Sequence, residues 1–309
     1  MKNHDIRYLR VILTTKCNLH CKGCHREGEG DTQNLVDFNF FCRAISNCIE
    51  AGIRKVKLMG GEPTLFPHTQ QLILFLKGKY PFIDLSMISN GLADVAYYSD
   101  CFSKGLDRLN LSIHGWKASY FFSTAGATEE MYQKRQDTLQ RLLAAGKISK
   151  INYVVKKGEN EEDLFLLIDW LSQFSDIRLD ILNFLTFYED DPGSRFYYSF
   201  EEIQDMLDKR FGIYDSFVYP NPHSIDSCNL ILKTGLNVNL KVNQLRDFHY
   251  MNICDSCPRK SMCIEGIAAM RLTSDFKLRP CLIRNDQYLD LSQADNDEKE
   301  RIEEYFKHI

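Results

Sequence analysis

No apolar run in the chain approaches the roughly 20 residues that a membrane-spanning helix requires. The first residues, Met1 to Asp5, also lack the apolar stretch of a signal peptide. Neither sign of charge dominates, because 38 basic and 42 acidic residues leave a net charge of −4. A disordered chain or a general nucleic-acid-binding protein is therefore not expected, and any phosphate site must be local. These absences predict a cytoplasmic, globular protein with no membrane or nucleic-acid partner.

A disulfide framework is not expected either. The chain has 11 cysteines, which is an odd number, and a reducing compartment keeps thiols free. Closely spaced cysteines in such a compartment indicate metal or redox chemistry. Four cysteines stand apart from any cluster and are interpreted as packing or structural residues, with the last in a loop-like region: Cys42, Cys48, Cys101 and Cys228.

Apart from an alternation of β-rich and amphipathic runs, the chain has no internal repeat. The expected strands span 7–13, 53–58, 83–88, 107–113, 150–155 and 177–182, and the expected helices lie near 37–51, 68–79, 94–103, 128–145 and 160–174. The predicted fold class is α/β, a partial (β/α)6 TIM-like barrel over residues 1–190. Residues 191–309 are predicted to form a small C-terminal domain with a helix from Phe200 to Phe211 and otherwise irregular chain.

Cys17, Cys21 and Cys24 follow the first expected strand. Three thiolates at this spacing can hold three irons of a 4Fe-4S cluster, which needs four ligands when fully ligated. The fourth iron is then open to a substrate or cofactor, which is a catalytic arrangement. Structural zinc is the alternative, because closely spaced thiolates also suit a tetrahedral ion.

The trio, together with Gly60-Gly61-Glu62-Pro63 after the second expected strand, resembles the radical S-adenosylmethionine (SAM) superfamily. The resemblance implies that the three cysteines hold the catalytic cluster and that its open iron binds the methionine part of SAM. It also implies that Gly60, Gly61, Glu62 and Pro63 bind the SAM amino group. Ligands of such folds bind at the carboxyl ends of the strands.

Cys254, Cys257, Cys263 and Cys281 form a second set. Four thiolates could saturate a second 4Fe-4S cluster, and structural zinc is again the alternative. The stretch from Met270 to Asp286 is similar to the auxiliary-cluster domain of the molybdenum-cofactor GTP 3',8-cyclase (MoaA-like) family. This resemblance covers most of the chain, including residues 25–28, 105–112 and 154–160.

The cyclase resemblance implies roles for residues along the barrel. In that family a 5'-deoxyadenosyl radical takes a hydrogen from GTP, and the second cluster contacts the guanine. By position, the GTP or SAM contacts are Arg10, Lys55, Lys57, Lys150 and Arg271, and the SAM contacts are Ser89, Asn90, Ser112 and Arg178. Each basic residue can also be an ordinary solvated charge, and each polar strand-end residue a turn former. Flavodoxin or ferredoxin is an expected electron donor.

Four features depart from the cyclase pattern. Ala269 stands where the family has an arginine, and Cys263 could close the auxiliary iron that the cyclases leave open. Phe276 replaces a turn glycine, so a left-handed backbone is not expected there. The chain also lacks a Gly-Gly tail. A twitch-type radical SAM peptide maturase and a zinc-stabilised binding protein are therefore kept as alternatives.

Overall fold

The computed structural model describes residues 7–26, 37–184, 194–219, 226–242, 252–258, 260, 263, 269–282, 284, 286–293 and 295–308. The predicted boundary near residue 190 lies outside these residues, and so do Glu27 and Gly28. Among the residues described, no helix is both long and apolar enough to cross a membrane.

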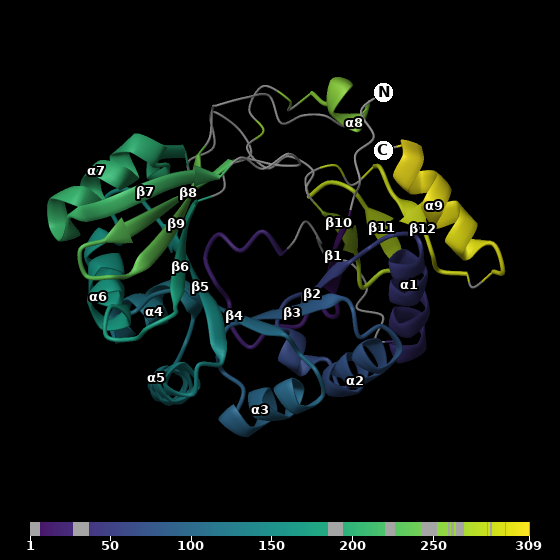
Figure 1. The fold of residues 1–309 in the computed structure, drawn as a ribbon, viewed down its shortest axis with the longest axis horizontal. Coiled ribbons are helices and arrows are strands. Elements are labelled where there is room, and N and C mark those ends of the chain that lie inside the picture. Colours follow the sequence, from purple (N-terminus) through teal and green to yellow (C-terminus); the bar gives the residue numbers. More distant parts are fainter. Residues whose placement is uncertain are drawn as a thin grey trace.

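One sheet of twelve strands runs through the protein in the order β12-β11-β10-β1-β2-β3-β4-β5-β6-β9-β8-β7. Its first six strands in the sequence are mutually parallel, as expected. They are β1 (Tyr8–Ile12), β2 (Lys55–Met59), β3 (Asp84–Ser89), β4 (Arg108–Ile113), β5 (Ile148–Val155) and β6 (Arg178–Asn183). Figure 1 shows that the sheet curves into an open ring, which confirms the α/β partial-barrel fold.

Helices cover the outside of this ring (Figure 1). They are α1 (Phe38–Glu50), α2 (Thr69–Lys79), α3 (Val95–Ser103), α4 (Ala118–Ala125), α5 (Glu129–Ala144), α6 (Glu161–Leu171) and α7 (Phe200–Phe211), with short 3-10 turns η2 (Pro63–Leu65) and η3 (Ser194–Phe196). Local capping sets several of their starts. For example, Asp37 accepts a hydrogen bond from the Phe40 amide and begins α1. The sequence did not predict α4.

The C-terminal segment is more regular than the sequence suggested. A meander of β7 (Ile213–Tyr219), β8 (Asp226–Leu232) and β9 (Asn237–Val242) adds to the sheet beside β6. The expectation of irregular chain was wrong here, and Cys228 lies buried on β8 rather than in a loop. The strict alternation of polar and apolar residues in β9 is a strand signal that could have been recognised.

The chain then returns to the other edge of the parallel strands. β10 (Met270–Leu272) pairs with β1, and β11 (Lys277–Arg279) and β12 (Leu289–Asp290) continue outward. The short helix α8 (Asn252–Asp255) precedes them, and α9 (Glu298–His308) packs against α1. Both predicted segments therefore contribute strands to one sheet, although the division near residue 190 stays a prediction.

The backbone of Phe276 differs from the sequence-based expectation. Its backbone has φ +66°, so it adopts the left-handed conformation that the sequence argued against. The Phe276 ring lies 3.9 Å from the Phe40 ring, between centroids, and this packing offsets the backbone strain.

Strand alternation separates two environments. Leu9 and Val11 belong to the apolar core between the sheet and the helices. Because successive side chains of a strand point to opposite faces, Tyr8 and Arg10 face the inside of the ring. The same parity places polar and charged residues of β2 to β6 on that inner face. The inside of the partial barrel is therefore polar, while the apolar core lies outside it.

Candidate active site

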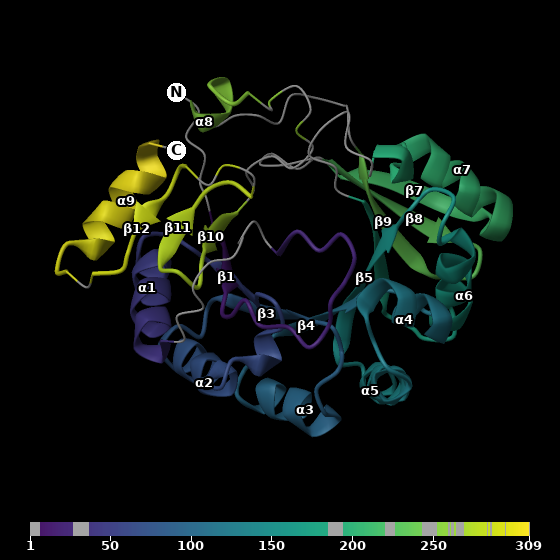
Figure 2. The same cartoon turned by 180° about the vertical axis from the view of Figure 1, so that it is seen from behind.

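The loop that carries the first cysteine trio lies inside the ring at one end of the barrel (Figures 1 and 2). The backbone amides of His20 and Lys22 donate to carbonyls of Ala125 and Thr124 at 2.8 and 2.7 Å. Leu19 packs into a small apolar cluster with Phe121 and neighbouring residues. Helix α4, which the sequence did not predict, therefore positions the cysteine loop.

The three thiols lie close enough to influence one another. Burial raises the pKa of Cys21 to about 12, and negative charge on Cys24 and Cys17 adds to the rise. Burial also raises the pKa of Cys17, with Glu62 and Cys24 contributing, whereas the Leu19 amide at 3.4 Å lowers it. Thiolates in this loop therefore need a positive partner, and a bound metal supplies one.

The trio is one cysteine short of the four ligands of a tetrahedral zinc site or of a fully ligated 4Fe-4S cluster. In the part of the chain that the structure describes, no three His, Cys, Asp or Glu side chains converge as ligands of one metal ion. In a 4Fe-4S cluster each cysteine holds a different iron, so the sulfurs are farther apart than around one zinc ion. A cluster with one cysteine on each of three irons would suit the trio.

Gly60 and Gly61 let the loop after β2 press against the cysteine loop. The Gly61 amide donates to the Thr14 carbonyl at 2.7 Å, and the Glu62 amide donates to the Lys16 carbonyl at 2.8 Å. A Cβ at Gly61 would lie 2.3 Å from the Lys16 oxygen, closer than any real contact. Only glycine allows the two loops to approach this closely, and the approach places residues 60–62 beside the segment just before Cys17.

Glu62 is fully buried, and its carboxylate joins the ends of β2 and β3. One oxygen accepts from the Thr64 hydroxyl and the Ser89 hydroxyl, both at 2.8 Å, and the other accepts from the Asn90 amide at 2.8 Å. Burial raises the pKa of Glu62, while these hydrogen bonds lower it. The Asn90 side chain in turn donates to Asn18, between the cysteines, at 2.7 Å. This network anchors the cysteine loop to the sheet, and direct roles of these side chains toward SAM stay predictions.

A row of cations crosses four neighbouring strands on the inner face. In register, Arg279 on β11 lies beside Arg271 on β10, then Arg10 on β1, then Lys57 on β2. Adjacent strands are about 4.8 Å apart, so these like charges repel one another. Three of these cations were predicted from the sequence, but Arg279 was not. Arg279 lies on the same face of the short strand β11 as Lys277 and directly precedes Pro280, and neither feature is a distinctive signal of a binding residue.

Electrostatic coupling shows that the cations share the inside of the barrel. Burial lowers the pKa of Lys57 well below its ordinary value, and Lys150 and Arg10 lower it further. Lys57 lies on β2 and Lys150 on β5, so they can interact only across the inner space. Burial also lowers the pKa of Lys241 on β9; Asp180 counteracts this shift, while cations that include Arg10 on β1 add to it. These basic residues of the inner face therefore lie close enough to influence one another.

Two of the predicted cations already have a counter-ion. Asp180, which is 4% exposed, accepts from Lys150 at 2.7 Å and from Arg178 at 2.8 Å. Lys57 forms no ion pair with a carboxylate among the described residues. Asp180 was not predicted from the sequence. It lies two residues after Arg178 on β6, so both side chains point to the inner face of the sheet. Ser112 lies on the same face of β4, beside Asn152 of β5.

The second cysteine set is described only in part. Arg284 donates to the Ile253 carbonyl at 3.2 Å and contacts the Cys257 thiol. Arg284 thereby connects the segment after Cys281 to the short helix that bears Cys254. Cys263 lies six residues after Cys257, with its amide 3.4 Å from the Lys260 carbonyl. Whether all four thiols share one cluster stays a prediction.

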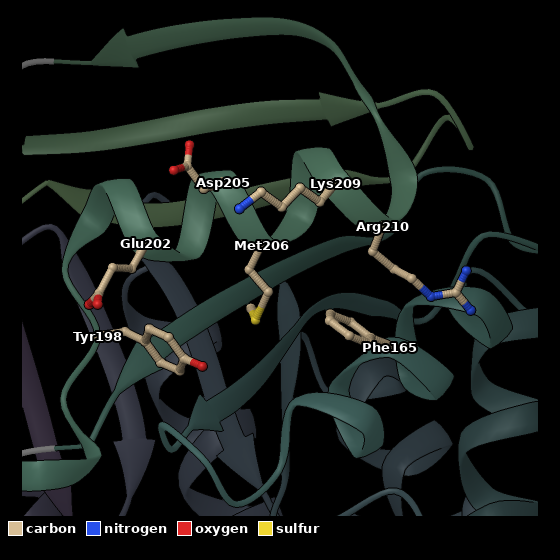
Figure 3. Close-up of a pocket in the computed structure, with 7 residues that line it drawn as sticks. All are labelled: Phe165, Tyr198, Glu202, Asp205, Met206, Lys209 and Arg210. Carbon is tan, nitrogen blue, oxygen red and sulfur yellow. The ribbon is translucent and has the colours of Figure 1, made fainter.

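An open groove on the outer layer of the protein has a different character. It lies between α6 and α7, and no cysteine lines it (Figure 3). Its lining residues are Phe165, Tyr198, Glu202, Asp205, Met206, Lys209 and Arg210. Acidic and basic side chains are balanced there, unlike the cationic inner face of the barrel.

Residues 11–171 match a family model described as the Radical SAM superfamily, which is more than half of the chain. The chain belongs to the radical SAM superfamily. Membership makes the protein an enzyme and implies SAM and a 4Fe-4S cluster, so the zinc-stabilised binding protein considered above is wrong. Membership in this superfamily is consistent with the cysteine loop, with the adjacent loop that contains Gly60 and Gly61, and with the curved parallel sheet.

Curated relatives of this radical SAM enzyme extend the likeness over nearly its whole length. A probable GTP 3',8-cyclase of Methanocella arvoryzae is 27% identical, over 96% of this chain and 88% of the relative. A probable GTP 3',8-cyclase of Sulfolobus acidocaldarius is 28% identical, over 93% of this chain and 85% of the relative.

Solved structures share the fold at lower identity. Streptococcus suis SuiB, in a crystal structure bound to S-adenosylmethionine, superposes with a TM-score of 0.61 at 15% identity. The match covers 93% of this radical SAM enzyme and 64% of SuiB, so the present chain spans less than two thirds of that protein's length.

Proposed function

We propose that this radical SAM enzyme acts on GTP or a related nucleotide, in a GTP 3',8-cyclase-like reaction of molybdenum cofactor biosynthesis. The observation that carries the proposal is the row of cations formed by Arg279, Arg271, Arg10 and Lys57 on the inner face of the barrel. Arg279 also pairs with Asp275 at 3.5 Å. A nucleotide triphosphate carries several negative charges in one ligand, which suits a surface on which four cations lie on adjacent strands. The cyclase names of the curated relatives support the same substrate.

The residues at the mouth of the barrel fit the cofactors that the superfamily implies. When bound, the cluster and SAM supply a 5'-deoxyadenosyl radical that takes a hydrogen atom from the substrate. Cys17, Cys21 and Cys24 would hold the cluster, and the glycines at 60 and 61 keep the neighbouring loop close to it. The buried Glu62 network holds both loops in register, which limits movement between cofactor and substrate.

The auxiliary set extends the proposal. Cys254, Cys257 and Cys281 would hold a second 4Fe-4S cluster, with Cys263 as the fourth ligand. The contact between Arg284 and Cys257 supports this arrangement, because a guanidinium stabilises thiolate ligands. If Cys263 ligates, the second cluster has no open iron, and the guanine must be held by side chains.

A substrate panel tests the proposed function. Anaerobic enzyme with reductant and SAM is expected to form 5'-deoxyadenosine faster with GTP than with ATP, guanosine or a peptide mixture. Lys57→Met should remove the stimulation by GTP, because it deletes the member of the row that lies on β2. Lys104→Met is the matched control, since Lys104 pairs with Asp100 beside α3, on the outer layer. Equal turnover across the panel, or stimulation by peptides alone, would contradict the nucleotide assignment.

A further inference from the structure

The strand β7 (Ile213–Tyr219) forms one end of the twelve-stranded sheet (Figure 1). Within the described residues it pairs only with β8, so its other edge has no partner strand. The opposite end of the sheet, β12, is only two residues long. Proteins usually protect a sheet edge with a very short strand, with lysine or with proline. β7 is seven residues long, contains neither lysine nor proline, and carries Asp215 as its one charged residue.

Large apolar side chains are exposed along β7. Tyr214 is 77% exposed, Phe217 45%, Val218 53% and Tyr219 51%. Because successive residues of a strand point to opposite faces, Val218 lies on one face of the sheet and Phe217 and Tyr219 lie on the other. Neither face of this part of the strand is therefore fully covered. The other exposed large apolar residues in the described part of the chain are scattered singly over other segments, which is ordinary.

Two contacts show which way the backbone groups of β7 point. Burial raises the pKa of Cys228 on β8, and a hydrogen bond from the Phe217 amide lowers it, so this amide points toward β8. The Ser216 amide instead donates to the neighbouring Asp215 carboxylate at 2.8 Å. Along a strand, the backbone groups of successive residues point alternately to the two neighbouring positions of the sheet. The backbone groups of Ser216 and Val218 therefore face the open edge.

The sequence of β7 suits pairing with a second copy of itself. After an irregularity near its start, the strand pairs regularly from Asp215 to Tyr219, and Phe217 is the middle residue of this run. An antiparallel copy centred there places Phe217 opposite the partner's Phe217, and Ser216 opposite the partner's Val218. Asp215 then meets the partner's Tyr219, whose hydroxyl can donate to the carboxylate. No charge opposes a like charge, and aromatic pairs are among the favourable cross-strand pairs.

We propose that two copies of this chain associate through their β7 strands, which pair antiparallel about Phe217 and continue the sheet from one subunit into the other. Each copy contributes the same residues, so a two-fold axis closes the interface. Association covers the exposed side chains of β7 and gives partners to the backbone groups of Ser216 and Val218. The inference is independent of the proposed substrate, because β7 carries none of the residues assigned to a cluster, to SAM or to the nucleotide.

The mass of the protein across a concentration series tests the inference. Sedimentation equilibrium is run anaerobically on the cluster-loaded enzyme, from low micromolar to sub-millimolar concentration. The wild type is expected to reach twice the 36.0 kDa mass of one chain. Phe217→Lys should remain monomeric, because it places two like charges opposite each other at the centre of the interface. Phe82→Lys is the matched control, because Phe82 is also exposed, at 60%, but lies in the turn before β3.

An exchange of charges tests the register of the two strands. Tyr219→Glu places a glutamate opposite the partner's Asp215 twice in the dimer, and should weaken association by about tenfold or more. Adding Asp215→Lys to Tyr219→Glu pairs opposite charges at the same positions, so the double variant should recover most of the lost affinity. Thermal unfolding and iron content are measured for every variant, and both should stay close to the wild type because the changes lie at the open edge of the sheet.

The outcomes separate a β7 interface from other contacts. A wild type that stays monomeric at every concentration overturns the inference and leaves this edge to a strand of a different protein. A dimer that Phe217→Lys leaves intact also overturns it, because the two copies then meet elsewhere. Equal weakening by Phe82→Lys and Phe217→Lys overturns it as well, since the effect is then not specific to β7. Recovery by the double variant supports the antiparallel register, and its failure to recover overturns that register.

Discussion

Lys150 donates to Asp180 at 2.7 Å inside the barrel, so a cation predicted to contact the substrate is already paired with a buried carboxylate. Asp180 also pairs with Arg178, so one carboxylate is the counter-ion of two cations. The site therefore keeps a net positive charge that a polyanion can neutralise, while its β5 and β6 side is partly balanced in the absence of substrate.

Asp180→Asn should tighten binding of GTP by about tenfold, because it frees Lys150 and Arg178 for phosphate. The same change should lower the free energy of unfolding, since it leaves Lys150 and Arg178 without their shared partner. Calorimetric titration and urea unfolding measure the two effects. Asp169→Asn is the control, because Asp169 pairs with Arg210 on the outer helices. Weaker binding in Asp180→Asn would mean that Asp180 orients the cations rather than competing for them.

Gly61→Ala should destabilise the protein by about 1–3 kcal/mol and lower its iron content, because the added Cβ collides with the Lys16 carbonyl. Gly78→Ala makes the same substitution inside α2, where nothing lies within 4 Å, and should instead stabilise by about 0.5–1 kcal/mol. Thermal unfolding and iron quantification compare the two variants. The two variants are expected to change the stability of the protein in opposite directions. An equal change in both would refute the close approach of the two loops.

Replacing Cys17, Cys21 or Cys24 with serine should each abolish SAM cleavage, because a cluster that loses one of three ligands is not retained in active form. Cys42→Ser on α1 changes a cysteine outside both sets and should keep wild-type iron content and turnover. Iron and sulfide quantification, with 5'-deoxyadenosine as the product measured, checks the prediction. Full activity in any variant of the trio would exclude that cysteine as an essential ligand.

His114 predicts a specific acid dependence of stability. Burial, with nearby Arg135, lowers the pKa of His114 from 6.5 to about 4. The unfolded chain then binds a proton near pH 6.5 that the folded chain does not, so stability falls as the pH drops from about 6.5 to 4. His114→Gln should reduce the loss of urea stability between pH 7 and pH 5. An unchanged pH dependence would show that His114 is protonated alike in both states.

Much of the barrel could be predicted from sequence. The six parallel strands and five of the helices between them lie within a few residues of their expected ranges, because a βα unit is encoded by local periodicity and by nearby stop signals. The cysteine trio and residues 60–63 were equally visible, since each motif is a short continuous run whose chemistry depends on residue type and spacing. The α4 helix escaped because it is only eight residues long and follows β4 closely.

The sequence by itself determined the parallel strands, the residues predicted to ligate the first cluster and the parity that turns each charged side chain inward. Only the tertiary structure decided how those charges meet. Arg10 and Arg271 are neighbours because β10 returns, 261 residues later, to pair with β1. Lys57 faces Lys150 because the sheet curves into a ring. Such contacts depend on sheet closure and register, which arise from packing over the whole chain and leave no local signal in the sequence.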